Sequence, residues 1–338
     1  MLSACIEKSQ TFPVPASPGI SLEPDVTSSP SEVVDVVPVE TNTLTPAASA
    51  TIALTPTHTA AAINQAGLVA FLGMEDPPAG LTPTNYDLFI MDSAGAVLRY
   101  TEGAAIRHFS WSPDSKAIVF SGIMHGSNYD LFLLDIENES ITKIDLTLEF
   151  DAAEIEPAWS PDGSRIAFAQ FLGGVSTIYL FDLADMSIEV VTEGSAPSWH
   201  PTGESLLFVK RTPGSFSGQL AQVTLADGEI TALFEGLFTD SPSWSADGTL
   251  VALVGHGPDR VGGVYVGRPV DQSLVLVSQS LLPPVWLPET NELIYCVPGP
   301  SPHHSRVYLY DPERQTSSPA DWINGEHFVY LAVPQPIK

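Results

Sequence analysis

Short apolar segments recur along the chain from about residue 64 onward, and turn-forming residues flank each of them. Many of these segments alternate apolar with polar positions, which is typical of β-strands with one buried face. The clearest are two near-copies, YDLFIMD at 86–92 and YDLFLLD at 129–135. Steps rich in Pro, Asp and Gly separate the segments, and these residues favour tight turns because of their backbone preferences. The pattern therefore predicts short strands joined by hairpins.

All six tryptophans head a repeated unit. They stand 36 to 48 residues apart, which brackets the period of a four-stranded propeller blade. Most of the windows resemble W-S-P-D-G and are followed by an apolar strand, an alternating third strand and a fourth strand. We predict that each Trp lies on the innermost strand and buries its ring between blades, as a structural residue rather than a ligand-stacking one. The six are Trp111, Trp159, Trp199, Trp244, Trp286 and Trp322.

The period, the four strands per repeat and the circular repetition predict an all-β fold, a β-propeller of four-stranded blades. Six alternating third strands favour six blades, with the Trp322 segment closing the first of them. The segment from His327 to Val333 has the apolar character of a second strand, although Leu68 to Gly73 already fills that slot. Seven blades, completed by an edge strand at Val33–Val39, are the alternative.

The W-S-P-D-G run, the apolar strand after it and the I-Y-L-F-D-like third strand resemble the WD-like propeller repeat of TolB and its relatives, which also caps the prolyl oligopeptidase family. The resemblance covers about Asn64 to Val333. It implies a TolB-like propeller. The α/β domain that precedes the propeller in TolB is replaced here by a segment rich in Thr and Pro.

The first sixty residues differ in composition from the rest. Pro, Ser and Thr dominate residues 9–60, where Phe12 is the only aromatic residue, so this linker is predicted to be disordered. Residues 1–8 contain L-S-A-C, which resembles the lipobox of bacterial lipoproteins with Cys5 as the lipidated residue. Because no apolar signal segment precedes Cys5, we expect the natural start to lie upstream. The propeller is assigned to 61–338.

Charge and cysteine content narrow the function classes. With 40 acidic against 13 basic residues and a formal charge of −27, the chain is not expected to bind nucleic acid or an anionic membrane through a basic patch. No apolar run reaches the roughly 20 residues of a membrane-spanning helix. Cys296 stands in an apolar strand, and we interpret it as a buried free thiol rather than half of a disulfide.

Strand order assigns the connections to two faces. The loops between second and third strands and the segments before each Trp-strand share one side, the loop face, while the opposite turn face holds only tight turns. Asp114, Asp162 and Asp247 of the turn face are predicted to accept backbone N–H groups of their own turns. The candidate binding residues lie on the loop face, where binding residues tend to gather: Arg107, His108, Glu154, Glu156, Arg211, Asp240, His256, Arg260, His303 and His304.

No metal or cofactor is predicted. The loop histidines, including His125, lack the spacing of a metal motif and are expected to be solvated. The acidic group Asp151, Glu154 and Glu156 offers oxygen ligands for Ca²⁺, but a solvated charge run is the favoured interpretation.

A catalytic motif is also missing, because no G-x-S-x-G elbow occurs in the sequence. We therefore expect a non-enzymatic extracytoplasmic lipoprotein that binds a protein or peptide through its loop face, with membrane contact only through Cys5. One alternative is a hydrolase or lyase that acts on a peptide or glycan at the channel mouth. Its carboxylates would come from Glu154, Glu156, Asp240 and Asp321. A purely structural envelope component is the other alternative.

Overall fold

The computed structural model describes the propeller region of the chain: residues 69–73, 86–92, 96–124, 126–146, 152–211, 218–235, 238–239, 241–257, 259–287, 290–298, 305–320 and 330–332. Every regular element in these ranges is a β-strand. No helix in this part of the chain is long and apolar enough to cross a membrane. Cys5, the linker 9–60, the Val33–Val39 segment and Trp322 lie outside the described residues.

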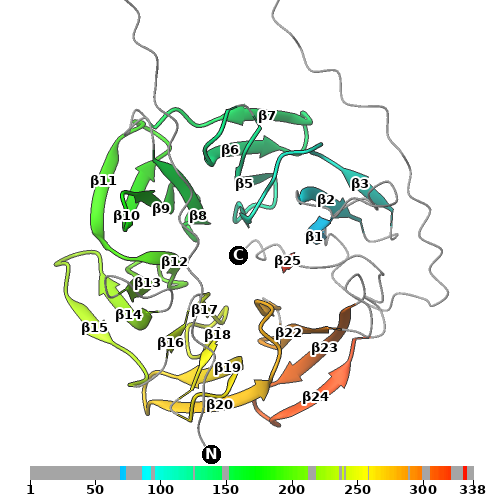
Figure 1. Cartoon of the computed structure of the whole chain (residues 1–338), viewed down its shortest axis with the longest axis vertical. Helices are drawn as coiled ribbons and strands as arrows, with labels where there is room; N and C mark the ends of the chain where they lie inside the picture. The colour runs from blue at the N-terminus through cyan, green and yellow to red at the C-terminus, as the bar shows by residue number, and fades with distance from the viewer. Residues whose placement is uncertain are drawn as a thin grey trace, which may run out of the picture. The chain divides into compact units, whose positions relative to one another are not determined.

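Six blades, each of four antiparallel strands, follow one another around a ring (Figure 1). From the inside outward, blade one contains β25 (Tyr330–Ala332), β1 (Val69–Gly73), β2 (Asp87–Met91) and β3 (Val97–Arg99). Blade two contains β4 (His108–Trp111), β5 (Ala117–Gly122), β6 (Asp130–Asp135) and β7 (Ser140–Lys143). Blade three contains β8 (Ala153–Trp159), β9 (Arg165–Leu172), β10 (Val175–Asp182) and β11 (Ile188–Glu193).

The other three blades repeat this order. Blade four contains β12 (Ser195–Trp199), β13 (Ser205–Arg211), β14 (Gly218–Thr224) and β15 (Ile230–Ala232). Blade five contains β17 (Ser243–Trp244), β18 (Val251–His256), β19 (Gly262–Arg268) and β20 (Ser273–Ser278). Blade six contains β21 (Val285–Trp286), β22 (Leu293–Pro298), β23 (Ser305–Asp311) and β24 (Thr316–Pro319). The prediction of six four-stranded blades is therefore confirmed.

Blade one is completed by strands from both ends of the described chain. β25 pairs antiparallel with β1, with Phe71 opposite Leu331 and Leu72 opposite Tyr330. We expected the Trp322 segment to close this blade and the apolar segment around β25 to be a second strand. Both expectations are wrong, because the strand that closes the blade is β25. It takes the innermost slot, which a Trp-strand occupies in the other blades, because β1 already lies between that slot and β2.

An additional short strand, β16 (Phe238–Thr239), joins blades four and five. It pairs with the start of β14 on one side and with the end of β18 on the other, so the two blades form one nine-stranded sheet. Thr239 is fully buried, and its hydroxyl donates to the carbonyl of Val254 at 2.7 Å. Five of the six described blade junctions have no such bridge, so β16 makes this junction unlike the others.

The tryptophans on the inner strands pack between blades, as predicted for the five that the structure describes. Two of them also bind the preceding blade. The indole N–H of Trp199 donates to the carbonyl of Ala158 at 3.0 Å, and that of Trp286 donates to Ser243 at 3.2 Å. Cys296 is a buried free thiol, also as predicted, and burial raises its pKa to about 11.

Tight turns on the turn face satisfy their own polar groups. In three inner hairpins a serine hydroxyl donates to an aspartate two residues later, and that aspartate accepts a backbone N–H, which confirms the predicted roles of Asp114, Asp162 and Asp247. In the outer hairpins an aspartate likewise accepts a backbone N–H of its own turn, without a serine two residues before it. Their aspartates are Asp92, Asp135, Asp182, Asp227, Asp271 and Asp311.

Candidate functional site

The pairing of the strands places one group of candidates at the loop-face end of blades two and three. His108 begins β4 opposite Ser121 at the end of β5, and Glu154 near the start of β8 lies opposite Gln170 near the end of β9. The backbone N–H of Glu154 donates to the carbonyl of Tyr129, which precedes β6. The neighbouring inner strands β4 and β8 thus bring these residues to one mouth of the ring.

Glu154 is a buried carboxylate, with only 7% of its surface exposed. The amide of Gln170, itself 5% exposed, donates to its Oε1 at 3.5 Å. Burial and the nearby Asp130 carboxylate raise the pKa of Glu154, against the opposing influence of Gln170 and Lys143. Glu154 therefore differs from the solvated charge run that we expected, because packing between blades covers it.

Comparison of the repeats shows that the fold does not require a polar pair at this place. The N–H of Ile106 donates to the carbonyl of Tyr86 in the way that Glu154 donates to Tyr129. Ile106 is fully buried, and Gly122 occupies the position that corresponds to Gln170. Blade three has therefore exchanged an apolar pair for a buried carboxylate and amide.

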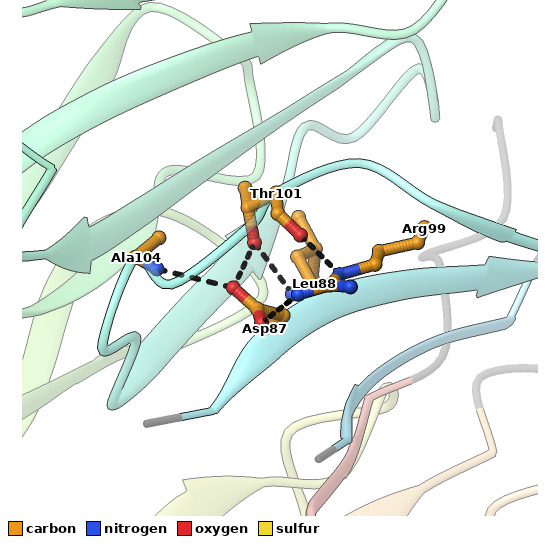
Figure 2. A network of polar contacts seen from close by, with 5 residues as sticks. All are labelled: Asp87, Leu88, Arg99, Thr101 and Ala104. Carbon is orange, nitrogen blue, oxygen red and sulfur yellow. Dashed lines mark hydrogen bonds and ion pairs between the residues drawn. The ribbon is translucent and has the colours of Figure 1, made fainter. Parts of the chain in front are cut away.

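Beside Glu154, Asp130 and Lys143 form an ion pair of 2.8 Å. The corresponding pair in blade one is Asp87 and Arg99, at 2.7 Å. Figure 2 shows that the Asp87 carboxylate also accepts from the Thr101 hydroxyl and from the backbone N–H of Ala104. This network fastens the third strand to the connection that leads to the next blade, so we interpret the acid–base pair as a structural element of the repeat.

Glu156 contacts the next inner strand. Its Oε2 accepts the backbone N–H of Ala196 at 2.6 Å, which links β8 to β12. Glu156 has a φ of 56° and Ala196 a φ of 52°, and irregularities in the strand pairing occur at both places. These bulges are equivalent, because each residue stands three positions before its Trp. The Glu156 side chain therefore links blade three to blade four.

Arg107 and His108 are neighbours with different environments. Arg107 is exposed, and its guanidinium carbon lies 5.1 Å from the ring centroid of Tyr129. The Nδ1 atom of His108 is buried and has no hydrogen-bond partner among the described residues. Burial, and secondarily the charge of Arg107, lower the pKa of His108 to about 4. His108 is therefore neutral at pH 7, in contrast to the solvated loop histidine that we expected.

The remaining candidates are spread over other blades. Arg211 ends β13, and its Nε donates to the buried hydroxyl of Ser195 at 2.8 Å. His256 ends β18 and Arg260 lies in the loop between β18 and β19, and both are exposed. The structure thus gathers four candidates at blades two and three: Arg107, His108, Glu154 and Glu156. Arg211, His256 and Arg260 lie on blades four and five, apart from this group. Asp240, His303 and His304, like His125, Asp151 and Asp321, lie outside the described residues.

Sequence reasoning missed two features of blade three. Gln170 stands in an apolar run that predicts no more than a strand. The tip of the β9–β10 hairpin exposes Phe171, Leu172 and Val175. The two glycines between them were a usable signal for a hairpin turn on the loop face.

Within the described ranges, no three His, Cys, Asp or Glu side chains gather closely enough to hold a metal ion.

Replacing Glu154 with Gln is expected to stabilise the protein at neutral pH. Its folded-state pKa is raised, so the contribution of Glu154 to stability is fully present below the unfolded pKa and is lost as pH rises through the folded pKa. We expect Glu154→Gln to gain about 1 kcal/mol at pH 7.5 and little at pH 4, near the unfolded pKa of about 4.3. Urea unfolding at both pH values measures this difference. The exposed Glu193→Gln is the control, and an equal gain at both pH values would contradict the prediction.

Comparison with known proteins adds the family context. A protein-family model described as "TolB beta propeller domain" matches residues 69–309. The Tol-Pal system protein TolB of Francisella tularensis subsp. mediasiatica is 26% identical over 224 residues, which cover 50% of this chain and 50% of the relative. The chain thus spans about half the length of the curated relatives that it matches first.

Two solved structures share the fold. The crystal structure of TolB from Acinetobacter baumannii has a TM-score of 0.65 and 20% identity, with 80% of this chain and 67% of that chain covered. The structure of a putative TolB from Agrobacterium tumefaciens has a TM-score of 0.56 and 17% identity, with coverage of 80% and 99%. At these identities the likeness concerns the fold alone.

Proposed function

Because the chain belongs to the TolB β-propeller family, we propose that it is a non-enzymatic, extracytoplasmic binding protein whose loop face engages a protein or peptide partner. The curated relatives bear the name of the Tol-Pal system, which supports a role in the cell envelope. The proposal extends to Cys5 as a lipid anchor and to residues 9–60 as a spacer between that anchor and the propeller. The L-S-A-C sequence and the composition of the spacer support this part.

The difference between the two faces is the observation that carries the proposal. On the turn face, the aspartates bind the backbone of their own turns and need no further partner. The turn face also exposes Lys116, Arg268 and Val270, but there the two basic side chains lie near the turn aspartates Asp114 and Asp271. The loop face presents five exposed basic side chains that form no ion pair with a described carboxylate, and one of its hairpins exposes three apolar side chains. Such groups gain from contact with another molecule. The basic residues are Arg107, Lys210, Arg211, Arg260 and Arg306.

The two candidate carboxylates that the structure describes do not favour catalysis at this mouth. Glu156 is engaged with the N–H of Ala196, and Glu154 is buried against Gln170. A pair of catalytic carboxyl groups must reach the same bond of a substrate. These two side chains instead contact different parts of the protein, so we do not propose a hydrolase or a lyase.

Site-specific photo-crosslinking in cells tests the proposal. A benzophenone amino acid replaces loop-face Arg107, Arg211 or Arg260, and we expect a discrete protein adduct from at least one of these positions. The matched controls are exposed basic residues on the turn face, and we expect no adduct from them: Lys116, Arg268 and Arg314. Adducts from the turn face alone, or from neither face, would refute the proposal.

The same cells report on the anchor. Expressed from its own genomic locus, the protein should fractionate with membranes, and Cys5→Ala should move it to the soluble fraction. Cys296→Ala is the control for loss of a thiol. Identical fractionation of the two variants would remove the lipid anchor from the proposal without affecting the partner-binding role.

A further inference from the structure

The β9–β10 hairpin of blade three carries an apolar tip on the loop face. Its two strands have eight residues each, the longest in the described structure, and Gly173–Gly174 joins them. Both glycines have positive φ, 60° and 88°, and a Cβ atom on either would meet nothing within 4 Å, so the turn stands in open space. Phe171 is 47%, Leu172 39% and Val175 50% exposed.

The direction of Phe171 follows from the packing below it. Side chains alternate along a strand, so Phe171 lies on the same side of β9 as Ala167. Ala167 belongs to the core between blades three and four, where it packs in one cluster with Leu206 and Phe208 of β13. By the same alternation, Lys210 lies on the side of β13 that faces blade three. Phe171 and Lys210 therefore approach the same junction from opposite sides.

This junction combines apolar surface with positive charge. Lys210 and Arg211 are adjacent basic residues, both exposed, and neither forms an ion pair with a described carboxylate. Arg211 shares the side of β13 with Leu207, which packs toward blade five, so it flanks the junction at the end of the strand. Arg211 is held in place through its Nε by Ser195 at the start of β12. The hairpin itself has no charged residue from 166 to 181. On the outermost strand of blade three, Glu193 is the acid at this end.

We propose that the junction between blades three and four, formed by the Phe171–Val175 tip and by Lys210 and flanked by Arg211, docks a partner segment in which apolar side chains alternate with carboxylates. This inference rests on the proposed function and specifies where on the loop face the partner binds and by what chemistry. The tip enters an apolar environment on the partner, and the partner's carboxylates pair with the two cations.

Charge selects this occupant over two others. A second copy of the chain would also carry a formal charge of −27, so self-association through one small apolar tip would work against long-range repulsion. An anionic lipid surface would meet the same repulsion. A short segment can place its carboxylates next to the two exposed cations and is attracted to them locally. A second copy of the chain and a lipid surface lack this advantage.

The test measures fluorescence anisotropy with the full chain and a labelled twelve-residue peptide in which Leu and Phe alternate with Asp and Glu. We expect saturable binding that Phe171→Ser and Lys210→Glu each weaken by at least about tenfold, and that salt weakens further. Peptides with Lys in place of the acids, or with Ser in place of the apolar residues, are expected to bind at least about tenfold more weakly.

Matched variants on the turn face serve as controls. Val270→Ser removes a side chain that is 87% exposed, and Arg268→Glu reverses an exposed charge, so neither is expected to change binding. The double variant Lys210→Glu, Arg211→Glu is expected to reverse the preference toward the Lys peptide. That reversal separates recognition at this junction from general loss of folding, and circular dichroism of each variant checks the fold.

Three results would overturn the proposal. The first is acidic-peptide binding that is absent or insensitive to Phe171→Ser and Lys210→Glu. The second is Phe171-dependent binding to vesicles of phosphatidylglycerol and phosphatidylethanolamine in place of peptide. The third is a dimer in sedimentation velocity that Phe171→Ser dissociates. If benzophenone at Arg107 or Arg260 still yields adducts while Phe171 yields none, the docking site fails and the proposed function stands.

Discussion

Deletion of residues 321–338 is expected to abolish cooperative folding of the propeller. This segment contains β25, which covers the inner edge of β1 through paired residues from Ala70 to Leu72. Without it, the backbone N–H and C=O groups of β1 lose their hydrogen bonds to β25, and the first blade exposes an unpaired inner edge. Lost hydrogen bonds and lost burial together should cost more than about 3 kcal/mol. Urea unfolding and size-exclusion chromatography should show a broad, early transition and soluble aggregates.

A circular permutant provides the control for this deletion. In the other blades the inner strand directly precedes the second strand, as β4 precedes β5. Residues 321–338 placed before residue 61 through a short linker would give blade one the same order and should restore the sharp transition. Deletion of 333–338 keeps β25 and should leave stability unchanged. A monomer of normal stability that lacks 321–338 would show that β25 does not close the ring.

The repeat could be predicted from the sequence because its signals are local. A Trp, a Ser/Asp turn and an apolar strand recur within a few residues of one another, and hairpin pairing requires no more than that. The identity of the closing strand could not be predicted in this way. The segment around Tyr330–Ala332 has the composition of a second strand, and its inner position depends on β1 having taken the second slot. That competition involves residues at opposite ends of the propeller.

The candidate site was only partly predictable for a similar reason. Position along the repeat placed Glu154 and His108 on the loop face, but their burial depends on how neighbouring blades pack. The chemistry of Glu154 follows from that burial and from Gln170, which the apolar pattern of β9 concealed. Likewise, the exposure of Phe171 depends on β9 and β10 extending into open space at the Gly173–Gly174 turn.

Replacement of Trp199 with Ala is expected to cause the largest loss of stability among the single substitutions considered. The indole is 7% exposed and packs with Ile178, Leu206 and other residues between blades three and four. It also donates to the carbonyl of Ala158 at 3.0 Å. Removing an aromatic ring of this size from a core costs about 3–5 kcal/mol, because the surroundings relax only partly. Urea unfolding followed by far-ultraviolet circular dichroism measures the loss without depending on the indole fluorescence.

Trp199→Phe separates packing from hydrogen bonding at the same position. It keeps an aromatic ring in the core but removes the N–H donor, so we expect a loss of about 1–2 kcal/mol. Trp159→Ala should cost less than Trp199→Ala, because Trp159 is only partly buried and its N–H donates to Gly163 within its own turn. That order follows if inner-strand indoles stabilise the ring by joining one blade to the next. Equal losses from both alanine variants would instead show that each indole stabilises only its own hairpin.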